Sequence, residues 1–238
     1  MANFEKGIGL NSDRLHRNIK EFKSAVDDVR SKIKEAGRVL FDGLKEKWAS
    51  PDAHVKSRDW NDLLCTVMIN LEGDQAVTID KVEDAAELVA KSLGASYKRV
   101  SDDIGMNYSW GKSDSGSFYG GWPTCLEAFP DGTVAMDVDS VKVILDLFNR
   151  NIEEVYTLMD AVPDRINIYD MNGDIQTGFS CRIKELKEKL VEGVKTVNTE
   201  LKSYMDQYIA DLMSAKAKAE SAIQDNFSNP GTGVVKSN

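Results

Sequence analysis

The sequence holds few of the residues that build metal, redox or disulfide sites. It has three cysteines and two histidines among 238 residues. Cys65, Cys125 and Cys181 are too far apart for a CxxC pair and odd in number, which argues against a disulfide framework. We interpret Cys65 and Cys181 as small apolar helix residues. His16 and His54 have no partner at metal-ligand spacing, so the sequence predicts neither a metal nor a cofactor.

Long apolar runs and basic stripes are also missing. No stretch approaches the roughly 20 uninterrupted apolar residues of a membrane-spanning helix, so we expect no membrane span. The net charge of −9 and the pI near 4.9 argue against nucleic-acid binding. The start, MANFEKGIGL, lacks the charged and then apolar regions of a secretory signal peptide. We therefore expect either a cytoplasmic protein or one exported to the outside or the cell surface by a route that uses no such signal.

The sequence contains none of the common catalytic motifs. A Gly-rich phosphate loop, a nucleophile with its base and a Glu-x-x-His pair are all missing, so we expect no enzymatic activity. The segment YDMNGDIQTG resembles half of a calcium loop, but Ile175 and Cys181 replace the required Gly and Glu. Its Asn172-Gly173 predicts a simple turn. We interpret the acids of DWNDL and VEDAAEL as solvated helix faces.

The chain is rich in helical periodicity, which begins with the segment from Asn11 to Trp48. Its apolar residues recur at alternating spacings of four and three, which predicts a helix of about 55 Å that packs along its length. Asn11 or Ser12 suits its N-cap. The apolar positions are Leu15, Ile19, Phe22, Val26, Val29, Ile33, Ala36, Leu40, Leu44 and Trp48.

A second helix is predicted to follow at Pro51, because proline suits the first turn of a helix and disfavours helical backbone at Ser50. Ser50 is then its N-cap. The apolar pattern weakens between Gly73 and Thr78, and a second piece is expected to open at Ile79-Asp80.

Two more helices are predicted in the second half of the chain. One opens at Asp137 or Asp139 and ends at Pro163, and the other runs from about Phe179 toward Phe227, about 75 Å if unbroken. The four segments predict an all-α fold of two long antiparallel helical hairpins, elongated and similar to a four-helix bundle. The hairpins pack side by side or end to end, and the sequence leaves both arrangements open.

The segment between the two hairpins has a different composition. Residues 95–137 are rich in Gly, Ser, Asp and aromatics, and CLEAF-PDG-TVAMD predicts a small β-hairpin with Thr133–Met136 as its return strand. The expected domains are a first hairpin at 1–94, this insertion at 95–137, a second hairpin at 138–227 and a flexible tail at 228–238.

Aromatic residues are candidates for an interaction surface. On a glycine-rich loop they suit an interface, although they also suit a small satellite core over the bundle. The last helix is predicted to be longer than the third, so its excess needs another protomer or a partner to cover it. The candidate residues are Tyr108, Trp110, Phe118, Tyr119, Trp122, Tyr208 and Leu212.

The turn between the first two predicted helices, in LKEKWASPDAHVKSRDWNDLL, carries the most specific pattern. Trp48 stands two residues before Ser50, and Ala53 and Trp60 continue the pattern of small and aromatic residues. This turn resembles that of the WXG family, in which Trp, any residue and Gly form the bend of a helical hairpin. Ser50 replaces the family's Gly, and two hairpins stand where the family usually has one.

The resemblance implies a function as well as a fold. It implies a non-enzymatic protein of a Gram-positive bacterium that is secreted by a type VII-like system or partners its substrates. Such a protein works through a protein partner or through self-association of helix faces. The alternatives are a structural subunit of a virion, filament or surface assembly, and a cytoplasmic adaptor. A tryptophan that merely closes the end of a helical bundle also accounts for Trp48.

Overall fold

The computed structural model describes residues 10–101, 103, 132–165 and 174–228, with side chains described except at 54, 174–180 and 225–228. Its helices are α1 (Ser12–Lys45), α2 (Pro51–Ser92), α3 (Val138–Ala161), the short 3₁₀ helix η3 (Pro163–Arg165) and α4 (Asp174–Ser228). Two short strands, β1 (Trp48–Ala49) and β2 (Ala135–Met136), complete the described elements. The predicted all-α fold is confirmed.

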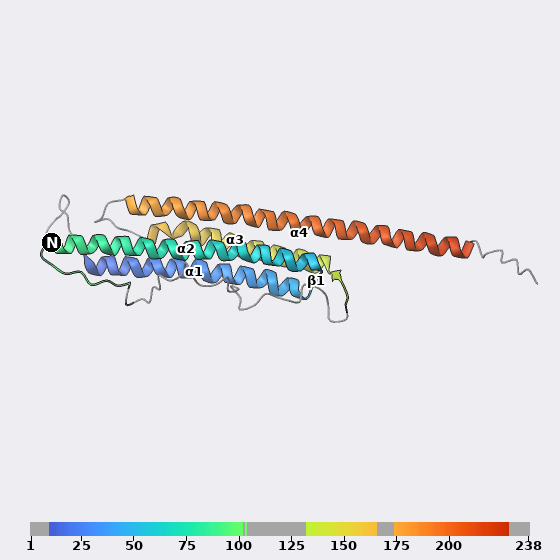
Figure 1. The fold of residues 1–238 in the computed structure, drawn as a ribbon, viewed down its shortest axis with the longest axis horizontal. Coiled ribbons are helices and arrows are strands. Elements are labelled where there is room, and N and C mark those ends of the chain that lie inside the picture. The colour runs from blue at the N-terminus through green and yellow to red at the C-terminus, as the bar shows by residue number, and fades with distance from the viewer. Residues whose placement is uncertain (1–9, 102, 104–131, 166–173, 229–238) are drawn as a thin grey trace, which may run out of the picture. The chain divides into compact units, whose positions relative to one another are not determined.

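The chain divides into two compact units, residues 1–195 and residues 196–238. In the first unit α1 packs against both α2 and α3, and these three helices lie side by side (Figure 1). In the second unit α4 continues from residue 196 to Ser228.

The first helix forms as its apolar seam predicts. All ten predicted seam positions, from Leu15 to Trp48, are buried. Asn11 rather than Ser12 is the N-cap, since its side chain accepts a hydrogen bond of 3.0 Å from the backbone N–H of Arg14. The helix ends at Lys45, three residues before Trp48, because the chain there passes into β1.

The second helix corrects one prediction. The break expected between Gly73 and Thr78 does not exist, and α2 runs without interruption over 42 residues. Leu71, Ala76 and Ile79 are buried on both sides of the glycine, so packing holds the helix where local propensity is weak.

Gly73 should therefore be a position where the helix can be stabilised. A Cβ atom built at Gly73 meets nothing within 4 Å. Gly73→Ala is expected to raise the free energy of unfolding by about 0.5–1 kcal/mol, because alanine loses less backbone entropy in a helix. Urea denaturation measures the change. A lower free energy of unfolding in the variant would contradict a straight, uncrowded helix at this point.

Gly193 has the opposite surroundings. A Cβ atom at this position in α4 would lie 2.2 Å from Cδ2 of Leu63 in α2. Gly43 of α1 is similarly close to Ile144 of α3, at 2.9 Å from Cγ1. The lack of a side chain at these two sites lets the helix pairs approach closely.

The return strand predicted at Thr133–Met136 is confirmed in part. Ala135–Met136 is a strand, but it pairs antiparallel with β1, with Trp48 opposite Met136 and Ala49 opposite Ala135. The predicted first arm, CLEAF, lies outside the described residues. The strand thus ties the start of α3 to the turn between α1 and α2.

The third helix begins and ends where the sequence predicts. Asp137 is its N-cap and accepts a hydrogen bond of 3.1 Å from the backbone N–H of Ser140. The helix ends at Ala161, and Pro163 opens η3. As predicted, the last helix is the longest of those described, since α4 has 55 residues. The predicted turn at Asn172-Gly173 lies outside the described residues.

Candidate functional site: the tryptophan turn and the Glu83 clamp

The turn between α1 and α2 is built around Ser50. Its backbone is extended, with φ −164° and ψ 159°, which serine adopts without strain. Its hydroxyl accepts a hydrogen bond of 3.0 Å from the backbone N–H of Ala53, and Pro51 occupies the first helical turn. A glycine is therefore not required at position 50, and serine contributes a cap that glycine lacks.

The small residue Ala53 lets α2 start close to the rest of the turn. It is fully buried, and its carbonyl accepts a hydrogen bond of 2.6 Å from the hydroxyl of buried Ser57. This bond satisfies the Ser57 hydroxyl inside the protein, where an unpaired hydroxyl is costly.

Two tryptophans pack together at the turn. The ring centroids of Trp48 and Trp60 lie 6.3 Å apart with an interplanar angle of 42°, and both side chains are buried. Within the described part of the chain, Trp60 Nε1 has no hydrogen-bond partner. Both rings therefore act as packing groups at this end of the helices and present no surface to a partner.

Further bonds attach this turn to the start of α3. The backbone N–H of Asp137 donates to the carbonyl of Lys47 at 2.7 Å, beside the paired strands. Hydrogen bonds from the side chain and backbone of Ser140 hold the pKa of Asp137 below its usual value. The turn, the two strands and the first turn of α3 thus form one connected unit.

The clamp at the other end of α2 was missed by the sequence analysis. Glu83, in VEDAAEL, was expected on a solvated face, but its side chain is fully buried. The prediction fails because Gly94, with φ +70°, ends the helix and reverses the chain so that Tyr97–Ser101 covers Glu83. We call Glu83 and residues 97–101 the Glu83 clamp.

The buried carboxylate of Glu83 accepts hydrogen bonds from Tyr97, Val100 and Ser101 of the returning segment. Its Oε1 accepts from the Tyr97 hydroxyl at 3.0 Å and from the Val100 N–H at 2.7 Å. Its Oε2 accepts from the Ser101 N–H at 3.3 Å and also from the Ser101 hydroxyl. Burial, with the charge of Glu83 next in importance, raises the pKa of Tyr97, so the phenol remains a donor.

Arg99 supplies the charge that opposes this carboxylate. Its guanidinium lies 3.5 Å from Glu83 and 2.7 Å from Asp84, and it also contacts Asp80 and Glu87. These four acids share one side of α2, because each lies three or four residues from two of the others. That ladder of acids, followed by an arginine beyond a glycine, is the sequence signal that would have located the clamp.

The clamp also reaches α1. The ring of His16 contacts the ring of Tyr97 edge-on, with centroids 5.2 Å apart, and its Nε2 lies 2.8 Å from the carbonyl oxygen of Lys98. The segment 97–101 therefore joins the end of α2 to the start of α1.

A second buried carboxylate lies midway along α2. Glu72 Oε1 is 3.0 Å from Nε of Arg30 in α1. Burial raises the pKa of Glu72 above its ordinary 4.5, because the loss of water outweighs the attraction of Arg30. Arg182 makes a comparable link from α4, with its Nε 2.7 Å from Asp74.

The raised pKa of Glu72 predicts a pH dependence. Above pH 4.5 the folded chain holds this proton more tightly than the unfolded chain, so the contribution of Glu72 to stability falls as pH rises through that window. The unfolding free energy of wild type should therefore fall relative to that of Glu72→Gln as the pH is raised from acidic to neutral. Urea denaturation across pH measures it, with exposed Glu185→Gln as control. Parallel curves for wild type and Glu72→Gln would contradict the prediction.

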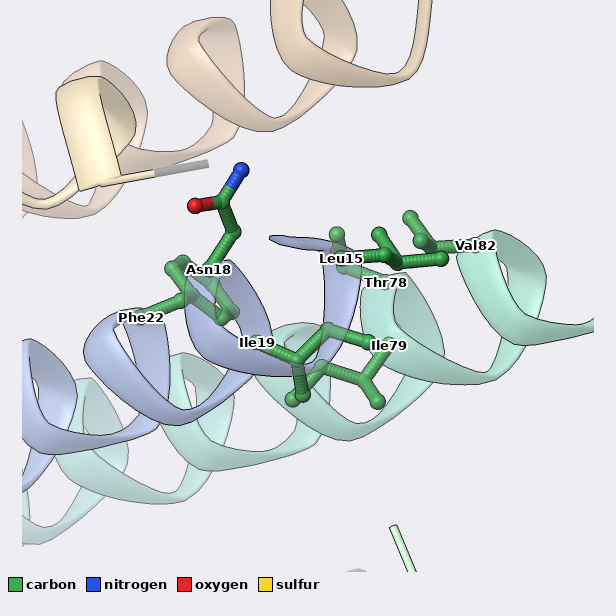
Figure 2. Close-up of a pocket in the computed structure, with 7 residues that line it drawn as sticks. All are labelled: Leu15, Asn18, Ile19, Phe22, Thr78, Ile79 and Val82. Atoms are coloured by element: carbon green, nitrogen blue, oxygen red, sulfur yellow. The ribbon is translucent and has the colours of Figure 1, made fainter. Parts of the chain in front are cut away.

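An apolar notch lies between the first turns of α1 and the C-terminal half of α2 (Figure 2). It measures about 240 Å³ including space open to solvent, which is below the roughly 300–1,000 Å³ of most ligand pockets. Its one hydroxyl, on Thr78, already donates to the carbonyl of Asp74 at 2.7 Å. The notch is therefore a packing feature. It is lined by Leu15, Asn18, Ile19, Phe22, Thr78, Ile79 and Val82.

The other predicted site residues belong to the second unit or to the insertion. Tyr208 is half-buried and Leu212 is exposed, both in the second unit. Cys65 and Cys181 both lie in helices, as predicted; Cys65 is half-buried in α2 and Cys181 is exposed in α4. The predicted interaction residues in the insertion lie outside the described residues: Tyr108, Trp110, Phe118, Tyr119 and Trp122.

The described residues contain no group of three or more side chains able to hold a metal ion. No helix among them has the length and apolar character needed to cross a membrane. Comparison with family models finds no match, and comparisons with curated proteins and with solved structures find none either. The WXG resemblance thus stays a prediction that rests on the turn residues.

Proposed function

We propose that this protein acts by binding other proteins, as a WXG-like helical protein that a type VII-like secretion system exports or that partners an exported substrate. The observation that supports the proposal is the turn between α1 and α2. There Trp48 packs on Trp60, Ser50 caps α2 at 3.0 Å, and buried Ala53 permits the tight approach. This is the construction that the resemblance requires of a hairpin bend.

The proposed partner contacts involve helix surfaces rather than the turn itself. Trp48 is only 2% exposed, so a partner or an export machine cannot contact its ring in the folded protein. On α3, Val143 and Leu147 are exposed and lie four residues apart on one face. Such an apolar pair is the type of surface that a partner helix covers.

Export is tested by expressing the protein in a Gram-positive host with a type VII apparatus and in the same strain without it. We expect the protein in the culture supernatant of the first strain only, with a cytoplasmic protein as the control for lysis. Trp48→Phe keeps an aromatic ring at the turn and should be exported like wild type. Equal release of the protein from both strains overturns the proposal. So does the absence of release from either strain, if the protein retained in the cells also binds no exported protein.

A structural subunit of a larger assembly is the second candidate, and exposed apolar residues on α2 and α4 favour it. Val77, Leu88 and Met213 are each more than half exposed. Light scattering during size-exclusion chromatography distinguishes the candidates. Open-ended growth with concentration supports an assembly subunit, whereas a fixed small species supports the secretion proposal.

A further inference from the structure

The apolar residues of α4 follow an 11-residue repeat. Ile183, Val194 and Met205 are spaced by 11 residues, as are Leu190, Leu201 and Leu212. Such a repeat keeps a nearly straight stripe along a helix, because 11 residues complete only slightly more than three turns. The stripe therefore has one face from the start of the helix to its end.

Burial of this stripe stops abruptly. Its members from Ile183 to Met205 are buried, whereas Leu212 is 57% and Ile223 is 58% exposed. Every residue from 210 to 224 is exposed. A single exposed helical segment such as residues 210–224 is only marginally stable in water. Covering its apolar side chains stabilises it.

The exposed stripe is self-complementary when a second copy runs antiparallel. Turning the helix about a point between Ala215 and Lys216 places Leu212 opposite Ala219. The same rotation places Tyr208 opposite Ile223. A large residue thus meets a small one near the centre, which is the pattern that lets two helix surfaces interdigitate.

The charges beside the stripe support the same arrangement. Asp211 and Lys218 lie seven residues apart, hence on one edge of the helix. In an antiparallel pair like edges face each other, so Asp211 of each copy approaches Lys218 of the other. The same twofold point brings Lys216 of the two copies close together beside the axis, and the two Asp211–Lys218 pairs offset that repulsion.

We propose that the stripe of α4 defined by half-buried Tyr208 and exposed Leu212, Ala219 and Ile223 binds a second copy of this chain as an antiparallel pair of helices. The contact closes on itself through a twofold axis, so it produces a dimer and not a filament. It does not depend on the secretion proposal. The helices in contact are only about 25–30 Å long, so we expect a weak dimer, with a dissociation constant on the order of micromolar.

Sedimentation equilibrium of the full chain over a wide concentration range tests the dimer. Wild type is expected to pass from monomer to dimer, and Leu212→Glu is expected to remain monomeric with unchanged helicity, since Leu212 is exposed in the monomer. Ser221→Glu is the matched control, because Ser221 is exposed on the opposite face and should leave dimerisation unchanged. A wild-type chain that stays monomeric, or a dimer that Leu212→Glu leaves intact, overturns the proposal.

Charge exchange tests the orientation. Asp211→Lys alone and Lys218→Asp alone should each weaken the dimer about fivefold to tenfold, because each places like charges opposite one another twice. The double variant should regain most of the wild-type affinity. Additive weakening in the double variant would overturn the antiparallel arrangement, and this outcome leaves the test of export unaffected.

Discussion

Replacing Glu83 with alanine is expected to lower the free energy of unfolding by about 3 kcal/mol. The substitution removes the acceptor for the Tyr97 hydroxyl and for the Val100 and Ser101 N–H groups. Each buried donor that loses its partner costs about 1–3 kcal/mol. The total loss of unfolding free energy is limited, because the segment 97–101 can detach from α2. Its donors then bond to water, and the protein loses only the free energy that held the segment in place.

Two measurements separate this local release from a general loss of stability. Urea denaturation gives the free energy, and hydrogen exchange should show the amides of Val100 and Ser101 losing their protection first. Glu87→Ala is the matched control, because Glu87 contacts the same Arg99 at 3.4 Å from a half-exposed position. We expect its effect to stay below about 0.5 kcal/mol. Equal effects of the two substitutions would show that burial of Glu83 is not what matters.

The helices were predictable because their cause is local. The spacing of apolar residues in α1 and α3 follows the helical period, and the caps at Ser50 and Asp137 are hydrogen bonds to residues three positions away. Each of these features is encoded within a single turn of the helix, so a reader of the sequence sees every residue that takes part.

The features that the sequence analysis missed depend on contacts between distant residues. Ala135 pairs with Ala49, and no pattern near either residue specifies that partner. Glu83 is buried by Val100 and Ser101. These residues come 17 and 18 positions later in the chain, after the reversal at Gly94. The path of the chain through the fold decides these two cases, and it cannot be predicted from the propensities of neighbouring residues.

The continuity of α2 has a related explanation. Gly73 costs about 1 kcal/mol in a helix, which suggests a break when the residue is considered alone. Burial of the large side chains around it on a helix that packs against α1 outweighs that amount, since each such side chain contributes about 1.5–3 kcal/mol. Tertiary packing therefore overrides the local preference.

Replacing Trp48 with alanine is expected to have the largest effect of any substitution at the turn. The side chain is 2% exposed, and removing a buried tryptophan typically costs about 3–5 kcal/mol. The effect should extend to α3, because Trp48 pairs with Met136 in the two strands that connect the turn to that helix. Trp48→Phe is the control, and it should lose clearly less because it keeps an aromatic ring.

A double-mutant cycle with Trp60 shows whether the two rings stabilise the turn as a pair. Their centroids lie 6.3 Å apart, a separation at which aromatic pairs contribute about 0.5–1.5 kcal/mol beyond their burial. Trp48→Ala and Trp60→Ala together should therefore cost less than the sum of the single effects by about that amount. Strict additivity would mean that each tryptophan fills its own site independently. The turn would then be two separate packing positions, and the resemblance to a tryptophan-built hairpin bend would lose its physical basis.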